Sequence, residues 1–179
     1  MINKLIIDGV QTELGENDKI PYTYTFATAK THNVKFALDG TNEISAEAFK
    51  NCANLTKINF PSQIKMIKRR AFENCTRLNN VVIPSTIEYI GANAFDGCTG
   101  LKTIKLSKEL TQIVGYAFRG CTSLTKIEIP EGVTEIHGNT FENCTGLTEV
   151  KLPEGLKTIY ANAFLSCTGL AEIKLPDSI

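Results

Sequence analysis

The sequence has no excess of charge of either sign and no long apolar run. Lysine plus arginine and aspartate plus glutamate both number 19 among 179 residues, so the formal net charge is zero. A zero net charge gives no electrostatic support for binding to nucleic acid or to an anionic membrane surface. No apolar run approaches the roughly 18 residues that a membrane-spanning helix needs. We therefore expect neither nucleic-acid binding nor membrane insertion.

The residue types that most often carry catalysis or bind metals are also few. The sequence has two histidines, His32 and His137, and its six cysteines form no C-x-x-C pair of the kind that holds zinc. A glycine-rich phosphate loop is missing as well. We therefore predict no metal site, no cofactor and no catalytic residue. The apolar stretch that begins at Met1 is too short for a signal peptide, and the localisation stays unknown.

What the sequence does have is a strict period of 23 residues that recurs six times. Three residue types recur at this spacing: Cys52, Cys75, Cys98, Cys121, Cys144 and Cys167; Phe49, Phe72, Phe95, Phe118, Phe141 and Phe164; and Leu55, Leu78, Leu101, Leu124, Leu147 and Leu170. Aligned on cysteine, the units read A-F-x-x-C-x-x-L-x-x-I-x-L-P-x-x-L-x-x-I-x-x-x. A spacing repeated in this way indicates a stacked array, in which each unit buries its apolar side against its neighbours.

Each unit contains two extended pieces and one tight turn. The segment Leu124–Pro130 alternates apolar and polar residues at its end, as a half-buried strand does, and proline then ends the strand. A second extended piece follows at Val133–Ile136. The A-F-x-x-C segment is predicted to form a short helical or 3-10 turn that points phenylalanine and cysteine inward. The prediction is an α/β solenoid of stacked parallel short strands.

These motifs carry a resemblance to a known family. The L-x-x-I-x-L strand in a 23-residue unit resembles leucine-rich repeats, and the A-F-x-x-C-x-x-L and L-P-x-x-L-x-x-I patterns are similar to the BspA-like subclass over residues 44–179, about five and a half units. The resemblance implies a non-catalytic binding or structural module that presents its surface to a protein or glycan, as in cell-surface adhesion. An alternative that it also implies is a phage virion fibre or decoration protein.

The two ends of the chain depart from the template. Residues 1–43 are predicted to form a β-rich N-terminal cap or docking segment, with a hairpin at Asp8-Gly9 and strands at Tyr22–Ala29 and Val34–Leu38. Such a cap would cover Phe49 and Leu55 in the first unit. The last residues, Leu175–Ile179, are still in register with the repeat. We expect either further repeats or self-association at this end.

The cysteines admit two interpretations. A buried, reduced cysteine acts as a small apolar filler, and a column of identical cysteines fits that role. The alternative is a cysteine-dependent enzyme that pairs Cys144 with His137, seven residues earlier. We favour the filler, and hence a protein that is not an enzyme.

The candidate partner-binding residues lie on and beside the second extended piece of each unit. The outward positions of the first piece vary between units but hold no aromatic anchor. The second piece and its flanks carry a local basic cluster and the exposed aromatic candidates. The predicted site residues are Lys65, Met66, Lys68, Arg69, Tyr89, Tyr116, His137 and Tyr160.

Overall fold

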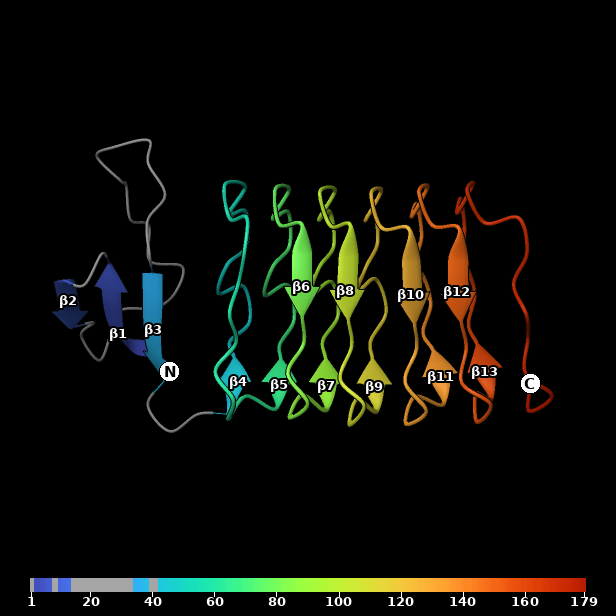
Figure 1. Ribbon diagram of the computed structural model, residues 1–179, viewed down its shortest axis with the longest axis horizontal. Coiled ribbons are helices and arrows are strands. Elements are labelled where there is room, and N and C mark those ends of the chain that lie inside the picture. Colours follow the sequence, from blue (N-terminus) through green and yellow to red (C-terminus); the bar gives the residue numbers. More distant parts are fainter. Residues whose placement is uncertain (1, 8–9, 14–33, 39–41) are drawn as a thin grey trace. The chain divides into compact units, whose positions relative to one another are not determined.

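The computed structural model describes residues 2–7, 10–13, 34–38 and 42–179, which divide into two compact units, Met1–Asn42 and Glu43–Ile179 (Figure 1). In the first unit, β1 (Ile2–Ile7) pairs antiparallel with both β2 (Val10–Glu13) and β3 (Val34–Leu38). Ile7 lies opposite Val10, which confirms the predicted hairpin, and β3 confirms the predicted strand at 34–38. The turn residues and the predicted strand at 22–29 lie outside the described residues. The covering of Phe49 and Leu55 by a cap stays a prediction.

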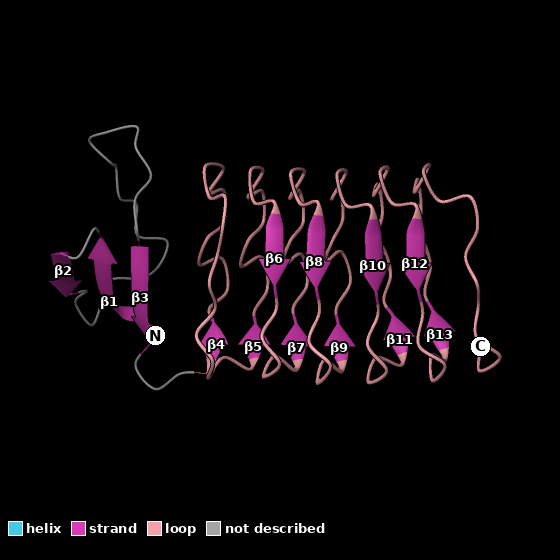
Figure 2. Cartoon of the chain, viewed as in Figure 1, coloured by secondary structure: helices cyan, strands magenta, loops and turns pink. Residues whose placement is uncertain are grey.

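The second unit is the predicted solenoid of stacked parallel strands, and each coil contributes up to two strands (Figures 1 and 2). One series consists of three-residue strands: β6 (Asn80–Val82), β8 (Thr103–Lys105), β10 (Lys126–Glu128) and β12 (Glu149–Lys151). The other consists of two-residue strands: β4 (Glu43–Ile44), β5 (Met66–Ile67), β7 (Tyr89–Ile90), β9 (Gln112–Ile113), β11 (Glu135–Ile136) and β13 (Thr158–Ile159). Paired residues stand one period apart, as Ile67 and Ile90 do.

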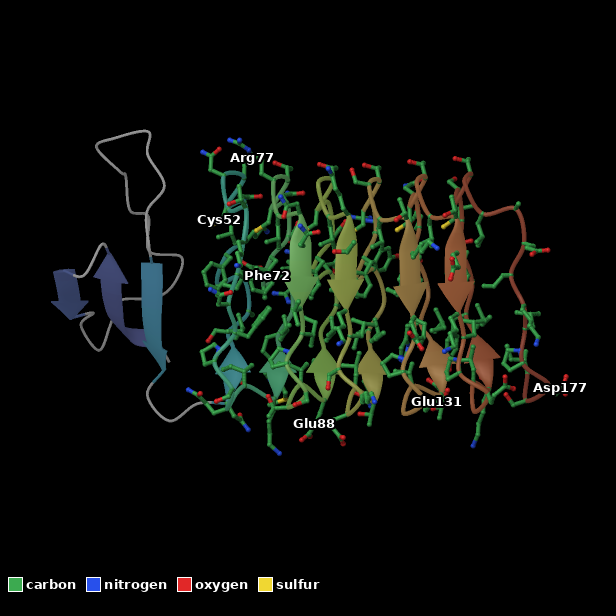
Figure 3. All side chains as sticks on the ribbon, in the orientation of Figure 1. Cys52, Phe72, Arg77, Glu88, Glu131 and Asp177 are labelled. Carbon is green, nitrogen blue, oxygen red and sulfur yellow. The ribbon has the colours of Figure 1, made fainter. Side chains whose placement is uncertain are left out.

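The repeated apolar residues form continuous columns inside the coils. The side chains of Phe72, Phe95, Phe118 and Phe141 are fully buried, and neighbouring rings stack in parallel with centroids 5.2–5.5 Å apart. Phe72 lies between the coils, whereas Glu88 projects from their edge (Figure 3). Aromatic pairs at this separation add about 0.5–1.5 kcal/mol beyond the burial of their area. The inward columns therefore act as the core that joins one coil to the next.

The phenylalanine-containing turns are not helical, so that part of the prediction is wrong. Two residues in each turn have a positive φ, one two residues before the phenylalanine and one two residues after it, such as Arg70 (57°) and Asn74 (59°). A left-handed residue cannot continue a right-handed helix. Alternate amides instead donate to the next coil: the N–H of Phe72 bonds to the carbonyl of Ala94 at 2.8 Å. We call this row of bonds between turns the turn ladder.

The cysteine column lies beside the phenylalanines, and all six cysteines are free thiols. Five of them are buried, and each of the five donates its thiol proton to the carbonyl of a phenylalanine in the preceding coil, as Cys98 does to Phe72 at 3.1 Å. Cys52, in the first coil, is exposed, so the prediction of a fully buried column is wrong at this position. The column otherwise fills the core and bonds adjacent coils.

Candidate functional site

The three-residue strands form one outward surface, which we call the long-strand face. Its charged side chains pair with one another along the column direction: Lys126 with Glu149 and Lys151 with Glu128, each with 2.6 Å between nitrogen and oxygen. Thr103 donates a hydrogen bond to Asn80 in the same way, at 2.8 Å. The polar groups of this face are thus largely engaged with their neighbours. Exposed ion pairs of this kind contribute little stability and leave few unpaired charges for a partner.

The two-residue strands and the residue after each of them form a second surface, the short-strand face. It contains most of the residues predicted to bind a partner. The predicted basic cluster lies at the N-terminal part of the solenoid, and the structure pairs each of its charges with a carboxylate. Lys65 lies 2.8 Å from Glu88, Lys68 lies 3.2 Å from Glu43, and the Arg69 guanidinium lies 3.6 Å from Glu47.

This pairing removes the charge-based argument for an acidic partner at the basic cluster. A carboxylate from the partner would have to compete with one already in place on the protein. Met66 and Tyr89, which stand next to the cluster on β5 and β7, are half-buried and are register partners in the sheet. These two side chains extend the wall of the coil and offer only part of their surface to a partner.

Tyr116 belongs to the turn and not to the short-strand face. It stands two residues before Phe118 and has the positive φ, 64°, that is typical of this turn position. The Arg119 guanidinium lies 5.1 Å from the centre of its ring. Arg119 also donates two hydrogen bonds to the buried Asp96, at 3.0 and 2.6 Å. Its bonds with Asp96 raise the pKa of Arg119. Tyr116 is therefore part of a charged network that joins neighbouring turns.

Both strand ladders are interrupted at the same boundary between two coils. The short strands pair in the order β4-β5-β7-β9, and then β11 pairs with β13; the long strands pair as β6-β8 and as β10-β12. The turn ladder continues across this boundary, since the N–H of Phe118 donates to the carbonyl of Thr140 at 2.9 Å. Thr140 is fully buried where the neighbouring coils have Ala117 and Ala163, so the column carries a larger side chain here.

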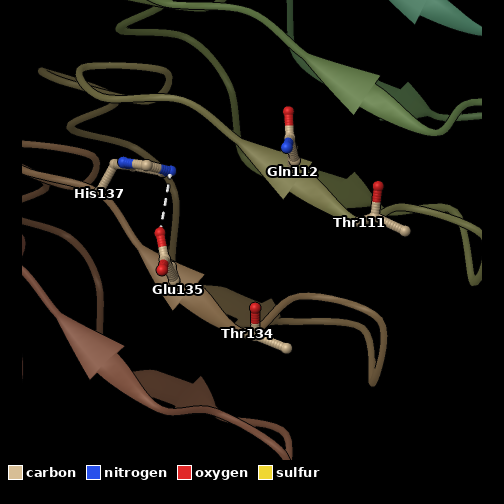
Figure 4. Close-up of a pocket in the computed structure, with 5 residues that line it drawn as sticks. All are labelled: Thr111, Gln112, Thr134, Glu135 and His137. Atoms are coloured by element: carbon tan, nitrogen blue, oxygen red, sulfur yellow. Dashed lines mark ion pairs between the residues drawn. The ribbon is translucent and has the colours of Figure 1, made fainter.

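A polar hollow lies at this interruption on the short-strand face (Figure 4). Its volume is about 210 Å³, and five side chains from two coils line it: Thr111, Gln112, Thr134, Glu135 and His137. The His137 imidazole lies 3.7 Å from the Glu135 carboxylate and stacks in parallel on the Tyr160 ring, with 5.5 Å between ring centres. The structure thus brings together two of the predicted residues, His137 and Tyr160, and the first of them lines this hollow.

The other residues of the hollow were missed by the sequence interpretation. Thr111, Gln112, Thr134 and Glu135 were not among the predicted site residues. In the repeat, Thr140 is the one non-alanine in the position before phenylalanine, and it stands in the turn that follows Glu135. A substitution in a buried column that is otherwise constant is the signal that could have directed attention here.

The proposed pair of Cys144 and His137 finds little support in the geometry. Burial raises the pKa of the Cys144 thiol to about 12, and that thiol donates to the carbonyl of Phe118 at 3.1 Å. A thiol must lose its proton to act as a nucleophile. The described residues include no group of three potential metal ligands, and they form no helix that could span a membrane.

Comparison with known proteins gives the following similarities. The model of a BspA-type leucine-rich repeat region matches six copies, over residues 18–114 and 65–179. Two solved leucine-rich repeat proteins, from Bacteroides ovatus and Eubacterium ventriosum, are each 30% identical to the chain with a TM-score of 0.68. The match covers 88% and 77% of this chain, respectively. A leucine-rich repeat protein from T. pallidum is 27% identical, with a TM-score of 0.60 and 75% of each chain covered.

The chain spans 52% of the length of the Bacteroides ovatus protein and 37% of that from Eubacterium ventriosum. A comparison with curated proteins finds no match.

Proposed function

The chain belongs to the BspA-type leucine-rich repeat family, and from this premise we propose that it is a non-catalytic adhesion module whose short-strand face binds a macromolecule on a cell surface. The repeats form a binding or structural module, in which constant inward columns hold variable outward residues in fixed positions. A rigid frame that displays variable residues is the arrangement that repeat proteins use for recognition.

One observation carries the choice of face. The polar hollow is lined in part by His137, on which the Tyr160 ring stacks, and it lies on the short-strand face at the place where the ladder of that face is interrupted. The long-strand face has its charges paired within the chain and holds no aromatic side chain in β6, β8, β10 or β12. Binding surfaces are enriched in aromatic residues, which offer large contact area with little loss of side-chain entropy.

The absence of catalysis is part of the same proposal. The thiols of the five inner cysteines are buried and donate their protons to backbone carbonyls, which suits packing and not nucleophilic attack. The carboxylates of Glu88 and Glu128 are held in ion pairs with lysine, and Glu135 is a carboxylate that lines the hollow, beside His137. General acid–base catalysis needs such groups to converge around a bound substrate.

The test compares two matched double variants in the same two coils. Gln112→Arg with Glu135→Arg blocks the short-strand face, and Thr103→Arg with Glu128→Arg makes the same change of charge on the long-strand face. Beads coated with each protein are counted after attachment to cultured epithelial cells. We expect the first variant to lower attachment by about tenfold, the loss that corresponds to roughly 1.4 kcal/mol, and the second to leave it unchanged.

Two results would contradict the proposal. If beads coated with the unmodified protein attach no better than beads coated with albumin, the protein has no adhesion function in this assay. Equal losses in the two double variants would show that neither face is specific and that added positive charge alone disturbs attachment.

A further inference from the structure

The interruption between β9 and β11 leaves backbone groups as well as side chains beside the hollow. In the following coil, the amides of Lys157 and Tyr160 donate to the carbonyls of Thr134 and Ile136, at 2.8 and 2.9 Å. The equivalent amides one coil earlier, those of Thr134 and His137, make no such bond to their neighbours within the part of the chain that the structure describes. Backbone groups released in this way are satisfied by water or by a ligand.

We propose that the hollow binds one neutral sugar ring of a glycan, an inference that rests on the proposed adhesion function and gives its ligand a chemical class. The five lining side chains supply hydroxyl, amide, carboxylate and imidazole groups, so that both donors and acceptors line a space of about 210 Å³. A sugar ring carries several hydroxyls, each able to donate and to accept. Pockets for larger, drug-sized ligands usually measure about 300–1,000 Å³.

Other ligand classes fit the hollow less well. None of the five lining residues is lysine or arginine, so an anionic ligand would have no fixed positive charge to meet. None of the five has a large apolar side chain, such as leucine or phenylalanine, of the kind that lines a pocket for an apolar ligand. A lysine side chain from a protein would pair with Glu135 but would leave the Thr134 hydroxyl and the Gln112 amide unused, whereas the Thr111 hydroxyl already donates to the carbonyl of Glu88 at 3.2 Å.

The walls of the hollow are positioned by the fold, without a ligand. Glu135 and Gln112 stand on strands of separate ladder segments, and the turn ladder fixes the two coils at Phe118 and Thr140. His137 is oriented by its parallel stacking on Tyr160 and by the Glu135 carboxylate. A site positioned before the ligand arrives loses less entropy on binding, which matters for a small polar ligand.

The experiment follows the His137 imidazole by NMR in the full chain. Because the sequence has two histidines, the His32→Gln variant leaves His137 as the sole imidazole. Glucose, galactose, mannose, N-acetylglucosamine and fucose are titrated one at a time. We expect at least one sugar to shift the His137 resonances saturably. Glu135→Gln should weaken that affinity by about tenfold or more, as loss of a charge-assisted hydrogen bond does.

The matched control is Glu128→Gln, which neutralises a carboxylate of the same coil on the long-strand face and should leave the sugar affinity unchanged. The same affinity loss in both variants would overturn the inference, as would a panel in which no sugar shifts His137. A shift produced by the peptide Gly-Lys-Gly and by no sugar would also overturn it, in favour of a protein side chain. If Gln112→Arg with Glu135→Arg abolishes attachment to cells, Thr103→Arg with Glu128→Arg does not, and no sugar binds, the adhesion function stands and the glycan inference falls.

Discussion

Truncation of one ring in the phenylalanine column should destabilise the solenoid far more than truncation of an exposed residue in the same coil. Phe95 is fully buried, and its ring stacks on Phe72 and Phe118 with centroids 5.2 and 5.5 Å apart. Phenylalanine-to-alanine changes in cores cost about 3–5 kcal/mol, and two stacked neighbours favour the upper part of that range. Lys105→Ala, at an exposed position of β8, should change stability by about 0.5 kcal/mol or less.

Both free energies of unfolding are measured by urea titration followed by circular dichroism. Because each coil contacts only its neighbours, loss of Phe95 should also weaken the coupling between the two halves of the array and can lower the m-value. Comparable losses for Phe95→Ala and Lys105→Ala would refute the assignment of inward and outward columns. A loss below about 1 kcal/mol for Phe95→Ala would do the same, because a buried ring cannot be removed at so low a cost.

Three further outcomes follow from the packing. Gly91→Ala should destabilise by about 1–3 kcal/mol, measured by the same titration, since a β-carbon there would lie 2.7 Å from the amide nitrogen of Arg69. Thr140→Ala should let the interrupted ladders close, so that the amides of Thr134 and His137 exchange with deuterium as slowly as those of Lys157 and Tyr160. Unchanged exchange rates would show that Thr140 does not cause the interruption. Raising the pH should lower stability between pH 9.0 and about 12, because burial raises the pKa of the Cys98 and Cys144 thiols in the folded chain from their usual 9.0 to about 12. The stabilisation that each protonated thiol contributes is fully present below pH 9.0 and declines by about 1.4 kcal/mol per pH unit above it. In thermal melts, the double variant Cys98→Ala with Cys144→Ala should lose stability less steeply with rising pH than the unmodified protein.

The inward columns were predictable because burial imposes the same demand in every coil. A position such as Phe118 must fill the same space as Phe95 before it and Phe141 after it, so the period is visible in the sequence alone. The parallel ladders follow from the same register. These parts of the fold depend on what the units share.

The turns were predicted less well because their backbone depends on single residues. Phenylalanine and cysteine three residues apart fit a helical turn, but Asn74 and Gly97, one residue before cysteine, adopt a positive φ and redirect the amides to the next coil. Asparagine and glycine before cysteine were the available signal.

The candidate site was predictable only in part. The residues His137 and Tyr160 stood out by their type, whereas Gln112 and Glu135 became part of a site through the interruption between β9 and β11. That interruption belongs to one boundary among several with nearly identical sequences. What differs between repeats, and not what recurs, decides where such a hollow forms.

Thiol labelling of the folded protein tests most directly whether the periodic residues form the core and leave function to the outward ones. The protein is treated with iodoacetamide at pH 8 without denaturant, and the modified cysteines are identified by mass spectrometry over time. We expect Cys52 to react quickly and the five buried cysteines to react only as fast as the chain opens. Rapid labelling of Cys144 in the folded chain would contradict this view and would restore a catalytic role for that thiol.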